Sequence, residues 1–110
     1  MKGTAGCLFL FSENQFKENI VAKIQSVPLF DQVAQKPLRM VLSSAQELDE
    51  DNQGRCLVPR NLREFAKIQK DVVFIGVGNH AEIWAKEVWE DYQANADFDK
   101  EMENLKENGI

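Results

Sequence analysis

Basic side chains are concentrated in one stretch of the chain. Residues 54–70 hold a single acid, Glu64, and a net charge of +4, whereas the whole 110-residue chain has a formal charge of −5. Guanidinium groups present planar forks of donors that match phosphate oxygens and guanine edges. The stretch is therefore a candidate nucleic-acid contact, although the average charge argues against such a partner. Its basic residues are Arg55, Arg60, Arg63, Lys67 and Lys70.

Three of these cations have helical spacing. Arg60, Arg63 and Lys67 are three and four positions apart, so a helix would place them on one face. The opposite face would be apolar, with Leu62, Phe65 and Ala66. A solvated helix face is the better explanation of these charges when they are taken alone.

A turn precedes this basic helix. Residues 52–54 are Asn-Gln-Gly, a strong turn signal, and Asp51 lies four positions before Arg55. A carboxylate at that spacing could orient Arg55 across the turn through a charge-assisted hydrogen bond.

Few residues could support catalysis or bind a metal. Cys7, Cys56 and His80 have no spacing that defines a Cys–His site, and we expect His80 in a solvent-facing hairpin turn. The acids of residues 47–51 lack the pattern of a calcium loop, and residues 76–79 lack the third glycine of a dinucleotide fingerprint. We therefore predict no enzyme activity, no metal, no cofactor and no small-molecule ligand.

The N-terminal apolar patch ends at Ser12 without a small-residue cleavage site, so we expect no signal peptide. No apolar run is long enough to span a bilayer. Two isolated cysteines fit a reducing cytoplasm.

The N-terminal part of the chain is predicted to supply a strand and a helix to the fold that positions the basic stretch. Residues 7–11 are a continuous apolar run that predicts a buried strand. Ser12 and Gln15 have capping-box spacing, which predicts a helix over about 13–26 that Pro28 ends.

A second helix is predicted after Asp31, which can cap it. Pro37 interrupts this pattern. We therefore predict either a kink at Pro37 or a helix that starts near Gln35, with the proline in its first turn.

From Gln46 onward the pattern is mainly that of strands. Residues 47–51 could form an edge strand, and residues 55–58 predict a strand. Residues 61–67 then predict a short helix. Residues 72–77 and 80–84 predict a hairpin joined by Gly78 and Asn79. A final helix is predicted from Val88 onward. Residues 95–110 are acidic and weakly periodic, which predicts a frayed end.

The order of these pieces resembles the C-terminal half of the MraZ family of bacterial transcriptional regulators, in the SpoVT/AbrB-like DNA-binding superfamily. A lone D-x-x-G-R is a weak signal, but the whole string in this order is specific. The resemblance extends to residues 6–11 and the helices after them. The pieces that match are residues 51–55, 56–59, 61–66, 72–79, 82–84 and Trp89.

This resemblance implies an α+β fold in which two repeats interleave into a swapped-hairpin β-barrel and subunits assemble into rings. Arginines of the D-x-x-x-R turns are the implied DNA contacts. Asp51 and Arg55 match that motif, with Gly54 in its turn, and Arg63 matches a basic helix position of the superfamily. We add Arg60 and Lys67 as DNA contacts from charge alone.

The first repeat is largely missing from the matched pattern. We expect residues 1–11 to be the last strand of a truncated first repeat and residues 12–45 a helical connector. Residues 46–89 would be the SpoVT-AbrB DNA-binding repeat, and residues 90–110 a C-terminal helix and acidic tail. Such a half-barrel would leave strand edges unpaired.

The implied function is a sequence-specific DNA-binding repressor of the division and cell-wall operon. It would act in the cytoplasm, at the nucleoid, as a ring-like oligomer on repeated operator boxes. The alternative is a truncated assembly module that oligomerises with relatives without reading DNA. An enzyme that uses a cysteine and His80 is a third hypothesis.

Overall fold

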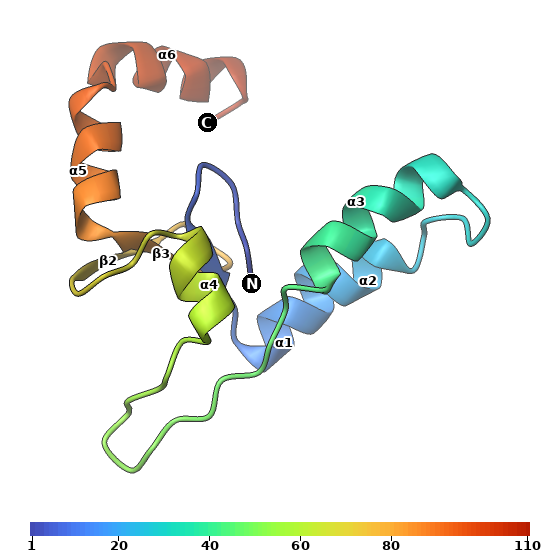
Figure 1. Ribbon diagram of the computed structural model, residues 1–110. Coiled ribbons are helices and arrows are strands. Elements are labelled where there is room, and N and C mark those ends of the chain that lie inside the picture. The colour runs from blue at the N-terminus through green and yellow to red at the C-terminus, as the bar shows by residue number, and fades with distance from the viewer.

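The computed structural model describes residues 1–110 and has an α+β fold built on a three-stranded antiparallel sheet (Figure 1). The strands are β1 (Leu8–Leu10), β2 (Val72–Gly76) and β3 (Ala81–Ala85), in the order β1-β3-β2. The predicted α+β class is confirmed, and this small sheet is compatible with half of an AbrB-like barrel.

The β2–β3 hairpin forms as predicted. Val73 pairs with Trp84 and Phe74 with Ile83, and the N–H of Val77 donates to the carbonyl of His80 at 3.0 Å to close the connection. Gly78 has a φ of +99°, a conformation that few residues other than glycine adopt readily. The turn chemistry of Gly78 and Asn79 therefore sets the register of the hairpin.

The other strand, β1, pairs with β3 through Leu8 and Ile83. Its outer edge is held by the N-terminus, because Phe9 and Met1 exchange two hydrogen bonds of 2.8 Å. No strand lies beyond β2, so β2 is an open edge.

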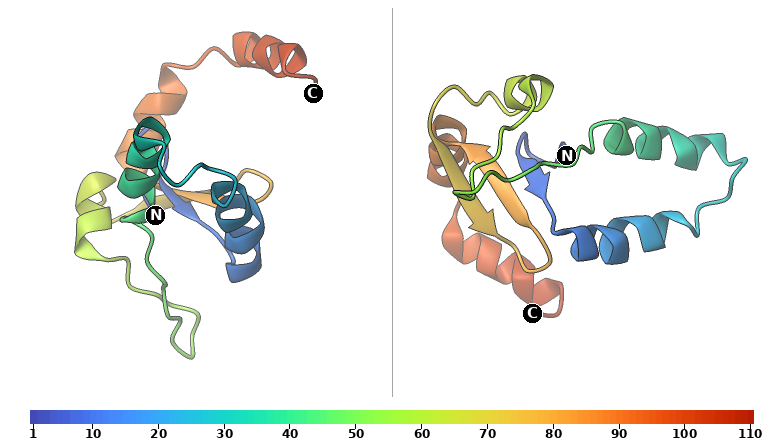
Figure 2. Two further views of the ribbon diagram at one scale, coloured as in Figure 1. Left: turned by 90° about the vertical axis from the view of Figure 1, so that its right-hand side faces the viewer. Right: turned by 90° about the horizontal axis from the view of Figure 1, so that it is seen from below.

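Two antiparallel helical arms leave the sheet and project away from it (Figure 2). The first arm runs continuously through α1 (Glu13–Phe16), a π-helical stretch η1 (Lys17–Val21) and α2 (Ala22–Ile24). The Ser12 hydroxyl accepts from the N–H of Gln15 at 3.2 Å, which confirms the predicted cap. The Gln15 side chain does not reach back, because its Oε1 accepts from Asn19 at 2.7 Å.

The second arm is α3 (Gln32–Leu42), capped by the Asp31 carboxylate, which accepts from the N–H of Ala34 at 3.1 Å. The predicted start near Gln35 is wrong, because the Asp31 cap begins the helix three residues earlier. Pro37 therefore lies inside the helix, where its ring removes one backbone hydrogen bond.

The core lies where α4 (Arg60–Phe65) packs on the sheet. Leu62 of this helix and Ala66, which directly follows it, contact Leu8 and Ile83 from the strands, and all four side chains are buried. The helix predicted over 61–67 is thus present, but it starts one residue earlier and ends two residues earlier than predicted. Its apolar face anchors the basic stretch to the sheet.

Two predicted strands are absent. Residues 47–51 and 55–58 lie in an extended loop that projects from the sheet (Figure 1), and neither segment pairs with a strand. A strand requires a neighbour for its backbone hydrogen bonds. The apolar residues 56–58 have strand-like composition, but the chain presents no partner to them.

The C-terminal region is more ordered than predicted. Helix α5 (Lys86–Ala94) carries Trp89 and Tyr92 onto Trp84 of β3, with ring centroids 5.2 and 4.8 Å from the Trp84 ring. The predicted fraying of residues 95–110 is wrong for α6 (Phe98–Glu107). Asp97 caps this helix by accepting from the N–H groups of Asp99 and Lys100.

Candidate nucleic-acid interface

The Asp51–Arg55 turn is a closed hydrogen-bonded loop. One Asp51 carboxylate oxygen accepts from the N–H groups of Gln53 and Arg55, each at 2.9 Å, and the other accepts from Arg55 Nε at 2.8 Å. The backbone N–H of Asp51 donates to the carbonyl of Arg55 at 2.8 Å. Gly54 has a φ of +77°, which fits the requirement for a glycine in this turn. The ion pair predicted from the four-residue spacing is present.

These bonds favour the charged form of Asp51. The N–H donors of Arg55 and Gln53, followed by the Arg55 guanidinium, hold the pKa of the Asp51 carboxyl below its usual value. The carboxylate therefore stays ionised at neutral pH and keeps its hydrogen bonds to Arg55.

The outer edge of Arg55 is free. Only Nε is used by Asp51, and 74% of the side chain is exposed. The two terminal nitrogens donate no hydrogen bond within the chain, so a planar pair of donors remains available. Such a pair matches the oxygens of a phosphate or the O6 and N7 of guanine.

The basic residues of α4 differ in whether an acid pairs with them. Arg60 donates from Nε to Glu64 Oε1 at 2.9 Å, so an acid of the same helix already pairs with it. Arg63 is exposed and takes part in no ion pair. Arg63 is therefore the free cation of this helix.

Lys67 does not lie on the helix, contrary to the prediction. The helix ends at Phe65, and Lys67 has a φ of +59°. The N–H of Lys67 donates to the carbonyl of Glu64, and the N–H of Ile68 to that of Arg63. This is the Schellman pattern, in which a left-handed residue satisfies the last carbonyls of a helix. Lys67 thus occupies the place where glycine is usual.

A groove of about 920 Å³, lined by both apolar and acidic residues, separates the projecting loop from β1 and the start of α1. His80 lines it together with Phe9 and Phe11, whose ring centroids lie 4.5 and 5.0 Å from the imidazole. The prediction of a solvent-facing His80 is wrong. The return of the hairpin places the imidazole over β1, and its Nε2 is buried without a hydrogen-bond partner.

The two thiols lie in different environments. Cys7 is buried, and this burial, followed by the Glu82 carboxylate, raises the pKa of its thiol to about 11. Cys56 is exposed on the projecting loop. A protonated, buried Cys7 is a poor nucleophile. No group of three or more potential ligands in the structure could hold a metal ion.

None of the helices combines the length and the apolar character that crossing a membrane would require.

Comparison with known proteins shows first that the chain is similar, over nearly its whole length, to proteins named as transcriptional regulators. A transcriptional regulator MraZ from Thermoanaerobacter pseudethanolicus is 49% identical over 111 residues, which cover 99% of this chain and 77% of the relative. Proteins of the same name from Syntrophomonas wolfei and Clostridium tetani are 41% and 38% identical, again over 99% of this chain and 77% of each relative.

The family follows from a second comparison. Residues 41–108 match the family described as "MraZ protein, putative antitoxin-like". This region contains the Asp51–Arg55 turn, α4 and the β2–β3 hairpin. The chain therefore belongs to the MraZ family.

Proposed function

We propose that this chain is a DNA-binding transcriptional regulator whose DNA contact is centred on Arg55. The observation that carries the proposal is the Asp51–Arg55 turn. It holds a guanidinium by its Nε, at the end of an exposed loop, with the two terminal nitrogens free. A donor pair fixed in advance loses little side-chain entropy when it binds DNA.

The second part of the proposed interface is α4. Arg63 supplies an unpaired cation on a helix that the buried Leu62 anchors to the sheet. Arg60 and Lys67 stand beside it as weaker contacts, because Glu64 already pairs with Arg60 and Lys67 lies beyond the helix. Phosphate contacts from these residues would fix the protein on the duplex, whereas Arg55 would read a base edge.

We further propose that the chain acts as an oligomer. A single copy offers one Arg55 turn and carries a net charge of −5, so its affinity for DNA is weak. Several copies on one assembly would bind repeated operator boxes together, and the effective concentration of each further turn would raise the affinity. In this proposal the chain represses the division and cell-wall operon as a ring bound at the nucleoid in the cytoplasm.

The test compares Arg55→Ala with Lys86→Ala, which removes an exposed cation from the start of α5, outside the proposed DNA contact. Affinity for a duplex from the region upstream of the operon would be measured by fluorescence anisotropy at several salt concentrations. We expect Arg55→Ala to weaken binding and to relax the preference for this duplex, as the loss of a base contact should. The slope of log affinity against log salt should fall by about one for each phosphate contact that is lost with it. Unchanged affinity in Arg55→Ala would overturn the assigned site.

A second candidate function is an assembly module that joins relatives without reading DNA. The unpaired segments 47–51 and 55–58 and the open edge of β2 favour it, because each offers backbone groups to another chain. Mixing the chain with a full-length relative and measuring co-elution tests this candidate. It fails if no mixed complex forms, or if the chain alone binds the operator duplex specifically.

A further inference from the structure

Helix α6 has an apolar face that is partly open to solvent, with Phe98 76% exposed and Met102 and Leu105 40% and 41% exposed. Phe98, Met102 and Leu105 recur at spacings of four and three, so they form one stripe. Every residue from 90 to 110 is exposed, including these three. A helix of this length is marginal in water unless its apolar face packs against something.

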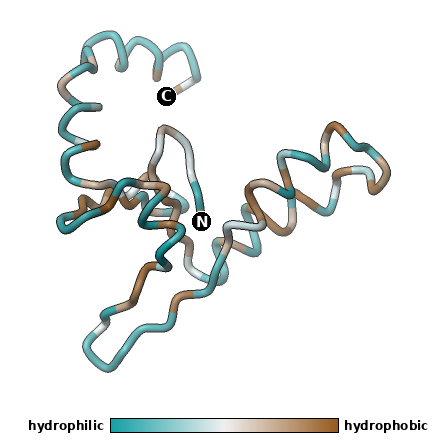
Figure 3. Tube along the Cα trace, in the orientation of Figure 1, coloured by the Kyte–Doolittle hydropathy of each residue, from teal (hydrophilic) through white to brown (hydrophobic).

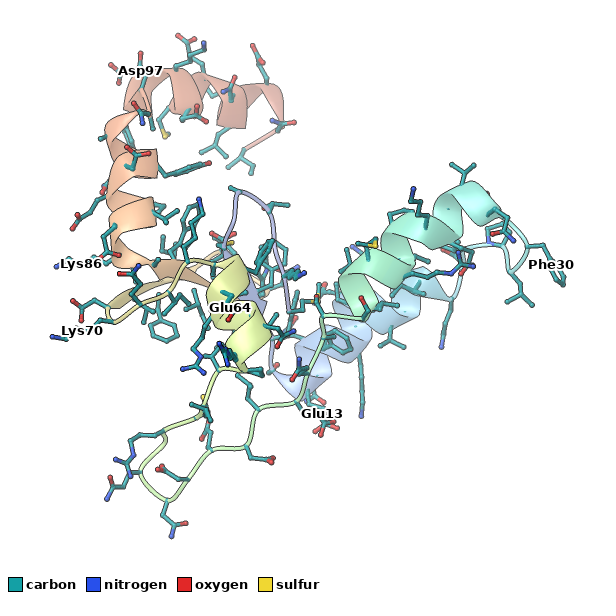
Figure 4. The ribbon with its side chains drawn as sticks, viewed as in Figure 1. Glu13, Phe30, Glu64, Lys70, Lys86 and Asp97 are labelled. Atoms are coloured by element: carbon teal, nitrogen blue, oxygen red, sulfur yellow. The ribbon has the colours of Figure 1, made fainter.

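A second uncovered apolar surface lies at the far end of the helical arms. Leu29, Phe30 and Val33 are 77%, 89% and 86% exposed. Figure 3 shows hydrophobic segments at this end of the arms, and Figure 4 shows Phe30 at their outer tip. We call these three residues, with Met40 on the same side of α3, the arm tip. The arm tip and α6 lie on opposite sides of the molecule (Figure 1).

The two surfaces carry opposite charge. Around the arm tip, residues 22–40 contain Lys23, Lys36 and Arg39 against one acid, Asp31, and none of these three cations forms an ion pair. Residues 97–107, which include α6 and its cap, contain five acids and two lysines. Opposite charges around two apolar patches favour association and disfavour the pairing of like patches.

We propose that the arm tip of one copy binds α6 of the next copy. Phe30 and Val33 would cover the stripe of Phe98, Met102 and Leu105, as an amphipathic helix lies against an apolar partner surface. Because the two surfaces differ, the contact is heterologous. Repetition of such a contact builds a ring if the rotation closes. The inference rests on the oligomeric part of the proposed function and names the contact that would produce it.

The charges that border the two apolar stripes suggest specific partners. Lys36 lies three residues after Val33 and four before Met40, so it stands beside the apolar residues of α3. Glu101 has the corresponding place on α6, three residues after Phe98 and four before Leu105. Each borders its stripe, and each is free of ion pairs within the chain.

The test uses full-length chains and exchanges these two charges. Lys36→Glu and Glu101→Lys would each be studied alone and then mixed in equal amounts, with assembly measured by sedimentation velocity at low salt. Each variant alone would place like charges in the contact, and we expect its association constant to fall about fivefold. In the mixture, the altered arm tip of one variant meets the altered α6 of the other, so assembly should recover.

The control is Lys70→Glu, which reverses an exposed charge outside both surfaces and should leave assembly unchanged. Phe30→Ser and Met102→Ser each remove an apolar contact without altering charge, and each should weaken association tenfold or more. Since Phe30 is almost fully exposed, its replacement leaves the fold of the single chain intact, which circular dichroism checks.

The proposal is overturned if the unaltered chain stays monomeric at all concentrations, or if Phe30→Ser assembles normally. It is also overturned if the mixed charge variants fail to recover while each remains helical. These outcomes leave Arg55 untouched, so they are distinct from a failure of DNA binding. Loss of operator binding in Arg55→Ala with normal assembly would support both proposals.

Discussion

Arg55 donates from Nε to a carboxylate oxygen of Asp51 at 2.8 Å, and its own backbone N–H donates to the other oxygen at 2.9 Å. One aspartate therefore fixes both the main chain and the side chain of the same arginine. The terminal nitrogens of Arg55 remain exposed to solvent. This arrangement orients a cation without burying it, so the turn is preorganised to bind an anion.

Replacement of Asp51 by Asn should separate orientation from charge. Asp51→Asn removes a negative charge, which raises binding to any duplex, but it also weakens the hold on Arg55. We therefore expect the ratio of specific to non-specific affinity to fall severalfold while non-specific affinity rises. Competition binding with operator and unrelated duplexes measures this ratio. The control is Glu47→Gln, which removes a nearby acid that does not contact Arg55. It should raise both affinities and leave the ratio of specific to non-specific affinity unchanged. If this ratio also falls in Glu47→Gln, the proposed role of Asp51 is wrong.

The titration of Asp51 should show which groups lower its pKa. The folded-state pKa lies below the unfolded value, so the stabilisation of the turn is present above the unfolded pKa and is lost as pH falls through the folded pKa. Carboxyl chemical shifts measured by NMR should place the Asp51 midpoint below 3.8, the ordinary value. In Arg55→Ala the midpoint should rise only in part, because the two backbone donors remain. A full return to the ordinary value would show that the guanidinium, and not the backbone, is the main cause.

Lys67→Gly should stabilise the chain. Lys67 holds a left-handed conformation with a φ of +59° at the end of α4, which costs a non-glycine residue roughly 1 kcal/mol. Glycine adopts this conformation without strain, so urea unfolding should show an increase of about 0.5–1 kcal/mol. Lys67→Ala removes the same charge and should show no such gain. Equal stability of the two variants would mean that Lys67 is not strained.

Leu62→Ala should destabilise the chain strongly. Leu62 is 3% exposed and joins α4 to Leu8 and Ile83, so its truncation leaves a cavity in a small core. We expect a loss of about 2–5 kcal/mol in the free energy of unfolding. Leu57→Ala offers a matched control, because Leu57 is 78% exposed on the projecting loop and should change stability by less than about 0.5 kcal/mol. Similar losses in both variants, measured by urea unfolding, would disprove this location of the core.

The elements that could be predicted from sequence are those with local causes. Ser12 and Asp31 cap their helices through hydrogen bonds that span only three residues. Gly78 closes a hairpin whose strands are neighbours in the chain. The Asp51–Arg55 bond spans four residues and was predictable for the same reason. In each case the partner group lies within a few positions of the chain, so the spacing of the residues is enough to predict the contact.

The predictions that failed depend on distant partners. Residues 55–58 have the composition of a strand but find no neighbour to pair with. His80 is separated by about 70 positions from Phe9 and Phe11, against which it packs, and no local pattern indicates that contact. The cap at Asp97 was a local signal that could have identified α6, but the acidic composition around it obscured this signal.

By itself, the sequence determined the helix caps, the hairpin turn, the charge pattern and the bond between Asp51 and Arg55, because short-range sterics and hydrogen bonding decide these features. It also carried the family resemblance that the comparisons confirmed. Only the tertiary structure decided which cations are free, where His80 lies, and which apolar faces remain uncovered. Those properties depend on how segments far apart in the chain pack together, and burial is a property of the packed molecule rather than of any one segment.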